Sequence, residues 1–183
     1  MQRILDKEQI LRESAAIFRQ MTDFCIEVPN DIFFKEPPGK WSIAQNLAHL
    51  IISLKTTVAA YALPKFIVRL IGGRPHRQSR SYDELVDQYQ QQLAAGGKAS
   101  GRFVPTRIHP SRTREHMLHK WLKVTEEYLE AIRKNWATEQ FDLYIVKHPL
   151  LGKITLRELC YFTIYHARHH LEIMKSRNTA QLN

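Results

Sequence analysis

Two histidines near the C-terminal end of the chain have a spacing typical of metal ligands. His166 and His170 are four residues apart, so on a helix their side chains lie on one face with Cβ atoms about 5–6 Å apart. Two imidazoles at this spacing can share one metal ion at about 2.0–2.1 Å per bond. They fall on the same helical row as Leu159, Phe162 and Ile173, which favours an inward direction.

A third histidine, His49, lies beside the apolar face of an earlier helical segment. It follows the cap residue Ser42 by seven residues, and His170 precedes the predicted end of the last helix by about seven. If these two helices are antiparallel, the three imidazoles lie at similar height near one end of a bundle. Three neutral imidazoles with open positions are typical of a catalytic metal site, which activates water or holds a thiolate. Taken alone, His49 is interpreted more simply as a residue at the edge of the apolar helix face whose ring hydrogen-bonds to the backbone.

The sequence gives no comparable reason to place the other histidines, or the cysteine Cys160, among the metal ligands. His169 lies between the paired histidines in sequence but points away from their face, so we expect it beside the site or exposed. Cys160 lies among apolar residues and is expected to be a core thiol. Surface positions are expected for four histidines on a charged helix face or in basic loops: His76, His109, His116 and His119. The sequence contains no Gly-rich phosphate loop, His-Glu-x-x-His motif or nucleophile elbow.

Helix starts are marked by capping boxes, in which a hydroxyl residue precedes Gln or Glu by three positions. They occur at Ser42–Gln45, Ser81–Glu84 and Thr155–Glu158. Together with the apolar periodicity they predict helices at 6–26, 42–62, 81–95, 113–136 and 154–177. Pro64 should break the second helix, with a short helical piece continuing through Leu70. Two stretches could be extended, 104–108 and 144–146, but they are not enough for a sheet.

The lengths of these segments predict the fold. Four of them exceed 20 residues, for which a four-helix bundle is the economical arrangement. The connection over 63–112 is about 50 residues long, so it can cross the bundle and let its flanking helices run parallel. We therefore expect a single domain over residues 1–183. Its fold is all-α, an up-down-down-up four-helix bundle whose long crossover carries a small extra helix.

The composition is that of an ordinary globular protein. Gly and Pro number 7 and 8 among 183 residues, which excludes collagenous and wholly disordered chains. Two cysteines cannot build a disulfide framework and are compatible with a reducing compartment. No signal peptide is visible, and the longest stretch without Lys, Arg, Asp or Glu is 14 residues, too short to span a bilayer. We expect a cytoplasmic protein without a membrane partner.

Positive charge is concentrated in the predicted crossover. The net charge is +9, and residues 65–114 carry ten Lys and Arg against three Asp and Glu. Nucleic-acid binding is one interpretation, but the aromatic residues needed to stack on bases are sparse there. A second interpretation is that five cationic side chains border the end of the bundle that carries the three histidines and hold the carboxylates of a ligand. A third is that they only keep the loop solvated. These residues are Lys98, Arg102, Arg107, Arg112 and Arg114.

Two segments resemble the DinB/YfiT-like superfamily. Lys40–His49, KWSIAQNLAH, is similar to the start of the second helix in that family. Gly152–Leu159, GKITLREL, with Tyr165–His170, YHARHH, is similar to the last. The resemblance runs over most of the chain, although only these segments are diagnostic. One departure follows the paired histidines, where many members have Arg-Gly-Gln and this chain has Leu171-Glu172-Ile173.

The resemblance implies a fold, a metal site and a range of activities. Members are up-down-down-up four-helix bundles, often homodimeric, and they hold a divalent metal, commonly zinc or nickel. The matching ligands here are His49, His166 and His170. Characterised relatives are S-transferases and isomerases that use bacillithiol, mycothiol or glutathione, and many others are regarded as metal-dependent hydrolases. The family name refers to induction by DNA damage and does not imply DNA binding.

These observations lead to a functional hypothesis with open alternatives. We expect a divalent-metal-dependent enzyme, a thiol-dependent S-transferase or a hydrolase, that acts on a small-molecule thiol and an electrophilic or acidic substrate. The first alternative is a metal-binding stress protein without turnover. The second is nucleic-acid binding through residues 65–114.

Overall fold

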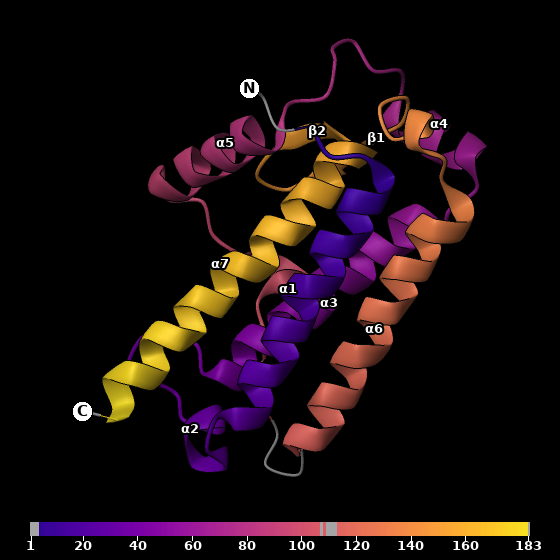
Figure 1. The fold of residues 1–183 in the computed structure, drawn as a ribbon. Coiled ribbons are helices and arrows are strands. Elements are labelled where there is room, and N and C mark those ends of the chain that lie inside the picture. The colour runs from indigo at the N-terminus through magenta and orange to yellow at the C-terminus, as the bar shows by residue number, and fades with distance from the viewer. Residues whose placement is uncertain (1–3, 107, 109–112, 183) are drawn as a thin grey trace.

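Four long helices build the protein, as seen in a computed structural model that describes residues 4–106, 108 and 113–182, the side chains of 178–182 excepted. They form one bundle around a shared apolar core (Figure 1). The long helices are α1 (Lys7–Glu27), α3 (Ile43–Ala62), α6 (Arg114–Asn135) and α7 (Leu156–Leu182).

The bundle has the predicted up-down-down-up topology. In Figure 1, α1 and α7 run from the upper end to the lower end, whereas α3 and α6 run upward. The helix α1 packs on α6 and α7, and α3 packs on the same two helices. Because α3 and α7 are antiparallel neighbours, residues in the first half of α3 face residues near the middle of α7.

Shorter elements complete the chain. The crossover leaves the upper end through α4, places α5 beside α7, and returns to the lower end before α6 (Figure 1). The small extra helix predicted in the crossover is α5, whereas α2 and both 3₁₀ helices were not predicted. These elements are α2 (Asn30–Phe34), α4 (Lys65–Gly72), α5 (Tyr82–Ala94), η1 (Gly101–Phe103) and η2 (Thr138–Gln140).

A β-hairpin precedes the last helix, so the expectation that no sheet forms was wrong. Strand β1 (Ile145–His148) pairs antiparallel with β2 (Gly152–Thr155), with Ile145 opposite Thr155. Gly152 has a φ of 69°, which glycine adopts without strain and which lets the chain turn. The hairpin takes residues 154 and 155, so α7 begins at Leu156 rather than at 154. Within the predicted stretch 104–108, the described residues form no strand.

The predicted capping boxes are present and connect the crossover to α7. The Ser42 and Ser81 boxes start α3 and α5. At the start of α7, the carboxylate of Glu158 accepts from the backbone amide of Thr155 at 2.8 Å. This carboxylate is fully buried and also accepts from Arg77 at 2.6 Å and from the backbone amide of Arg80 at 2.8 Å. One buried carboxylate thus ties the segment before α5 to the first turn of α7.

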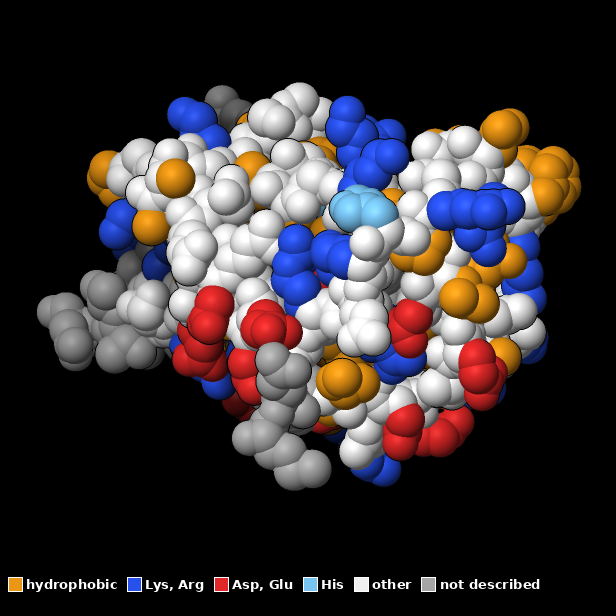
Figure 2. Space-filling view, turned by 90° about the horizontal axis from the view of Figure 1, so that it is seen from above, with side chains coloured by type: hydrophobic (Ala, Val, Ile, Leu, Met, Phe, Trp, Pro, Cys, Tyr) orange, Lys and Arg blue, Asp and Glu red, His pale blue; other side chains and the backbone are white. Residues whose placement is uncertain are grey.

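The end of the bundle that carries α4 is partly apolar. Phe66, Leu70 and Ile71 are 73%, 82% and 70% exposed. Apolar side chains gather at the right-hand edge of the view from above, on the side where α4 lies, next to Lys and Arg side chains (Figure 2). Within the described part of the chain no single helix is long and apolar enough to cross a membrane; α3 and α4 pass that test only as a pair, bent by 110°.

Candidate metal centre

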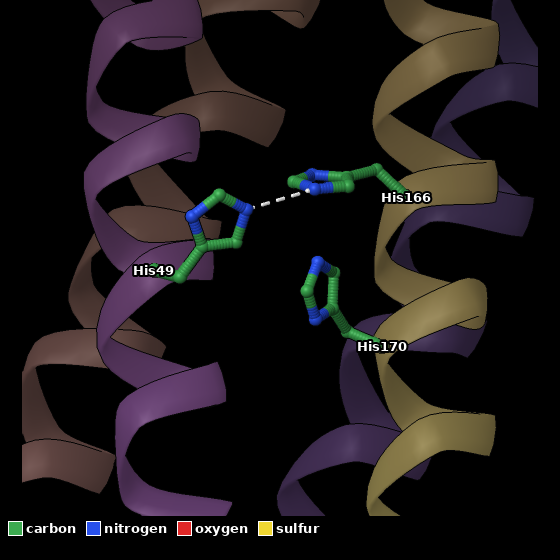
Figure 3. Close-up of side chains that lie close together, drawn as sticks. All are labelled: His49, His166 and His170. Atoms are coloured by element: carbon green, nitrogen blue, oxygen red, sulfur yellow. Dashed lines mark hydrogen bonds between the residues drawn. The ribbon is translucent and has the colours of Figure 1, made fainter. Parts of the chain in front are cut away.

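The three histidines singled out from the sequence converge between α3 and α7. His49 projects from α3 toward His166 and His170, which project from α7 (Figure 3). One ring nitrogen of each residue lies within 4.8 Å of the others. All three side chains are buried, with exposed fractions of 5%, 6% and 7%. The i,i+4 spacing on α7 and the antiparallel neighbour α3 together produce this cluster.

The crossover orients His49. Its Nδ1 lies 2.7 Å from the carbonyl oxygen of Phe103, the last residue of η1. Because a carbonyl oxygen can only accept, Nδ1 carries the hydrogen, and in the neutral ring Nε2 keeps its lone pair. That Nε2 lies 3.0 Å from Nε2 of His166. The crossover therefore fixes which nitrogen of His49 faces the other imidazoles.

An asparagine on α3 orients His170. The Nδ1 atom of His170 lies 2.8 Å from Oδ1 of Asn46. The amide of Asn46 donates through Nδ2 to the carbonyl of Ser42 at 2.8 Å, which assigns Oδ1 as the acceptor. His170 thus donates from Nδ1 and keeps the lone pair on Nε2. A hydrogen bond on the outer nitrogen is the usual way in which proteins orient a metal-ligating histidine.

The cluster favours neutral imidazoles. Burial lowers the pKa of His166 well below its ordinary value, and the nearby His170 and His49 lower it further. Burial also lowers the pKa of His170, with a further contribution from His49. The pKa of His49 is lowered by burial, although its bond to the Phe103 carbonyl acts in the opposite direction. Neutral imidazole is the form that binds a metal ion.

The donor set fits a divalent cation. Nitrogen ligands at 2.0–2.1 Å from a tetrahedral ion lie about 3.4 Å apart, and the 3.0 Å separation of His49 and His166 is near this value. One ring nitrogen of each of the three histidines lies within 4.8 Å of the others, so all three can face a single ion. Two lone pairs with fixed tautomers point into one buried space, and a cation would satisfy both. Three nitrogen ligands also leave positions open for a water or substrate.

A cavity of about 360 Å³ opens onto the three imidazoles. Its walls include aromatic rings, and the ring of Trp41 is stacked at 9° to that of His170 with centroids 6.4 Å apart. Three cationic side chains also line it, those of Lys98, Arg102 and Lys147, and none of the described lining residues is acidic. The cavity thus combines apolar walls with positive charge.

The predicted cationic border is present only in part. Lys98 and Arg102 line the cavity. Arg114 does not, because its guanidinium donates to the carbonyl of Val28 just after α1, at 2.6 Å. Its expected place at the site is therefore corrected to a contact between α6 and the end of α1. The predicted residues Arg107 and Arg112 lie outside the described residues.

The remaining histidines and Cys160 mostly lie where expected. His76, His116 and His119 are exposed, and His109 lies outside the described residues. His169 is half-buried and lines the cavity. Cys160 is fully buried, and burial raises the pKa of its thiol to about 11, as for a core cysteine.

Sequence reasoning did not find Asn46, Trp41 or His148 as parts of the site. The structure places Trp41 and His148 in the cavity wall and Asn46 against His170. Asn46 lies three residues before His49, within the segment that resembles the DinB/YfiT-like family. That one-turn spacing was the available signal, since it puts both residues on the same face of α3.

Comparisons with known proteins show the family of the chain and support its fold. The sequence model of the DinB superfamily matches residues 8–174. The chain belongs to the DinB superfamily. Among solved structures, this DinB-superfamily chain is similar to YfiT from Bacillus subtilis, described as a probable metal-dependent hydrolase with an unusual four-helix bundle topology. The similarity has a TM-score of 0.57 at 17% identity and covers 97% of this chain and 90% of that one, which supports the fold. No curated protein matches the sequence.

Proposed function

We propose that this protein is a divalent-metal-dependent enzyme that activates a water molecule or a small-molecule thiol at the three-histidine cluster. One observation carries the proposal: three buried imidazoles converge within 4.8 Å at the wall of a cavity of about 360 Å³. Zinc and nickel are the proposed ions, because both accept imidazole ligands. A bound ion of this kind supplies Lewis acidity, which lowers the pKa of water to about 7 or holds a thiol as its thiolate.

The chain's own residues would prepare the reaction. Phe103 and Asn46 hold the outer nitrogens of His49 and His170, so that the inner nitrogens face one point. A bound ligand packed against the apolar part of the cavity wall would displace water there, which strengthens electrostatic interactions. Lys98 and Arg102 at its border would hold an anionic group of the substrate or of the thiol.

The proposal covers thiol transfer and hydrolysis, and one experiment separates them. The full-length protein would be loaded with zinc or nickel and incubated with an anionic electrophile, with and without a thiol such as glutathione. Adducts and hydrolysis products would be identified by mass spectrometry. A thiol adduct that forms only with the metal-loaded protein indicates an S-transferase, and a hydrolysis product without thiol indicates a hydrolase.

The matched control is His49→Ala, which removes the one ligand on α3. It should lose both the bound metal, by elemental analysis, and any turnover. Full metal content in His49→Ala would remove this residue from the centre. Stoichiometric metal without turnover over a broad panel of electrophiles would favour a metal-binding protein that is not an enzyme.

A further inference from the structure

A histidine at the tip of the β-hairpin has its tautomer fixed by the backbone. Nδ1 of His148 accepts from the amide of Leu150 at 3.2 Å and from the amide of Leu151 at 3.1 Å. A ring nitrogen that accepts has no hydrogen of its own, so the neutral ring carries its hydrogen on Nε2. The turn therefore determines which edge of this imidazole can donate.

The ring of His148 lies at the cavity, one aromatic ring away from the metal centre. It lines the cavity and contacts the ring of Phe162, with centroids 4.2 Å apart. Phe162 is in turn stacked on His166, with centroids 4.8 Å apart and planes at 21°. Because Phe162 contacts both His148 and His166, a ligand bound at the cluster reaches His148 by extending along the wall past this one ring.

The donor on His148 is available and uncharged. No hydrogen-bond partner for its Nε2 lies among the described residues. Burial lowers the pKa of His148 to about 4, so the ring is neutral at pH 7. Its sequence neighbour Lys147 also lines the cavity and adds a positive charge. A neutral N–H beside a cation is suited to bind a carboxylate.

We propose that Nε2–H of His148 binds a carboxylate of the substrate, at the end opposite to the group that reacts at the three-histidine cluster. The inference rests on the proposed function, because it takes the cavity to be the substrate site. It specifies the substrate class further: a molecule with a metal-seeking group and a carboxylate separated by a short apolar spacer. His148 would then determine specificity and would not take part in bond making.

A purely structural role for His148 makes different predictions, and two variants separate the roles. In His148→Asn, Oδ1 is bonded to Cγ as Nδ1 is, so it can accept from the two turn amides while the outer donor is lost. In His148→Gln, the terminal amide lies near the position of Nε2, so a donor remains while the acceptor for the turn is lost. A structural role predicts that Asn is tolerated and Gln is not. The specificity role predicts that His148→Gln keeps the binding of the carboxylate and that His148→Asn loses it.

The test uses cobalt-substituted, full-length protein, in which bound thiolate gives a charge-transfer absorption band. The probes are mercaptoalkanoates with three to five methylene groups, and mercaptoalkanols of equal length are the matched controls. Wild-type protein should bind the best carboxylate probe at least about tenfold more tightly than its alcohol control, as expected for a hydrogen bond to a charged group. His148→Asn should lose most of this ratio with unchanged cobalt content, and His148→Gln should keep more of it.

Each other outcome has a definite meaning. An unchanged ratio in His148→Asn, or no preference for the carboxylate in the wild-type protein, overturns the role of His148 and leaves the metal centre standing. Failure of the wild-type protein to take up stoichiometric cobalt overturns the proposed function, and this inference with it. Should His148→Asn fail to fold, His148→Leu, which also lacks the donor, takes its place. Loss of the ratio in His148→Leu, with the ratio kept in His148→Gln and in Lys147→Ala, supports His148, whereas loss in Lys147→Ala alone assigns the carboxylate to the lysine.

Discussion

Asn46 contacts the candidate metal centre without being one of its three histidine ligands, so it can be substituted while all three ligands remain. The bond between Oδ1 of Asn46 and Nδ1 of His170 sets the tautomer and direction of that ring. Asn46→Ala should lower zinc affinity by about 10–100-fold, because the ring loses its orientation and basicity. Competition with a chromophoric chelator measures this change. Asn46→Asp, which keeps an acceptor at the same position, should retain most of the affinity; equal loss in both variants would contradict the role assigned to this bond.

The sequence was informative about the ligands and much less so about their supports. The spacing of His166 and His170, the register of His49 and the resemblance to the DinB/YfiT-like family together predicted the cluster. By contrast, the partner of His49 is a backbone carbonyl in the crossover, and any residue type supplies one. The ring of His148 is held at the cavity by hydrogen bonds from the backbone of a turn, and residue types alone did not predict that turn. Such contacts depend on which segments meet in space, and spacing along one helix carries no information about that.

At the scale of elements, Glu158 is the residue that joins the crossover to α7. Burial alone would raise the pKa of this carboxyl, but the bonds from Arg77 and from the backbone amides of Arg80 and Thr155 outweigh burial and lower it. A carboxyl with a lowered pKa in the folded state stabilises the protein above its ordinary pKa, and this contribution is lost as the pH falls through the folded value.

Glu158→Gln should therefore lower the free energy of unfolding by about 2–3 kcal/mol at pH 7, since it leaves a half-buried arginine without its counter-charge. The difference from the wild-type protein should begin to narrow below about pH 4.5, where the carboxyl becomes protonated in the unfolded chain, and should be lost as the pH falls through the lowered pKa of the folded state. Urea unfolding between pH 7 and 3.5 measures both effects. The control, Glu130→Gln, removes an exposed i,i+4 pair with Lys134 and should leave the free energy of unfolding almost unchanged. A cost for Glu158→Gln that does not change with pH would contradict the ionic basis of this junction.

The helices were predictable because their starts and faces are both encoded locally. Capping boxes at Ser42 and Ser81 and the apolar periodicity gave the boundaries of α3 and α5 within a residue or two. The hairpin was missed because each of its strands has four residues, too few for a period of two to stand out. The last helix continues to Leu182 rather than ending at residue 177, since nothing in that stretch breaks a helix.

At the scale of the whole molecule, a metal at this site would join α3 to α7 across the bundle. A ligand that binds only the folded state stabilises it, by about 2.7 kcal/mol at a free concentration of 100 times Kd. For a chain of 183 residues this corresponds to an increase in Tm of about 5–10 °C. Differential scanning calorimetry with and without zinc measures the shift. His166→Ala should show little or none, and an equal shift in that variant would mean that zinc stabilises the protein from another site.

The topology could be predicted because connection lengths constrain it. A middle connection of about 50 residues, between shorter outer ones, permits α3 and α6 to run parallel. The path of that connection was not predictable, and the path brings Phe103 to His49 and Lys98 and Arg102 to the cavity while leaving Arg114 at the end of α1. Long-range packing of a crossover depends on the side chains it meets, which a charge count over 65–114 does not describe.

The most direct test of the metal centre is a crystal structure of the zinc-loaded protein with anomalous diffraction data collected on both sides of the zinc absorption edge. The proposed centre predicts one strong anomalous peak, 2.0–2.2 Å from a nitrogen of each of His49, His166 and His170. A peak bound elsewhere on the chain, with these three imidazoles hydrogen-bonded only to one another, would contradict it.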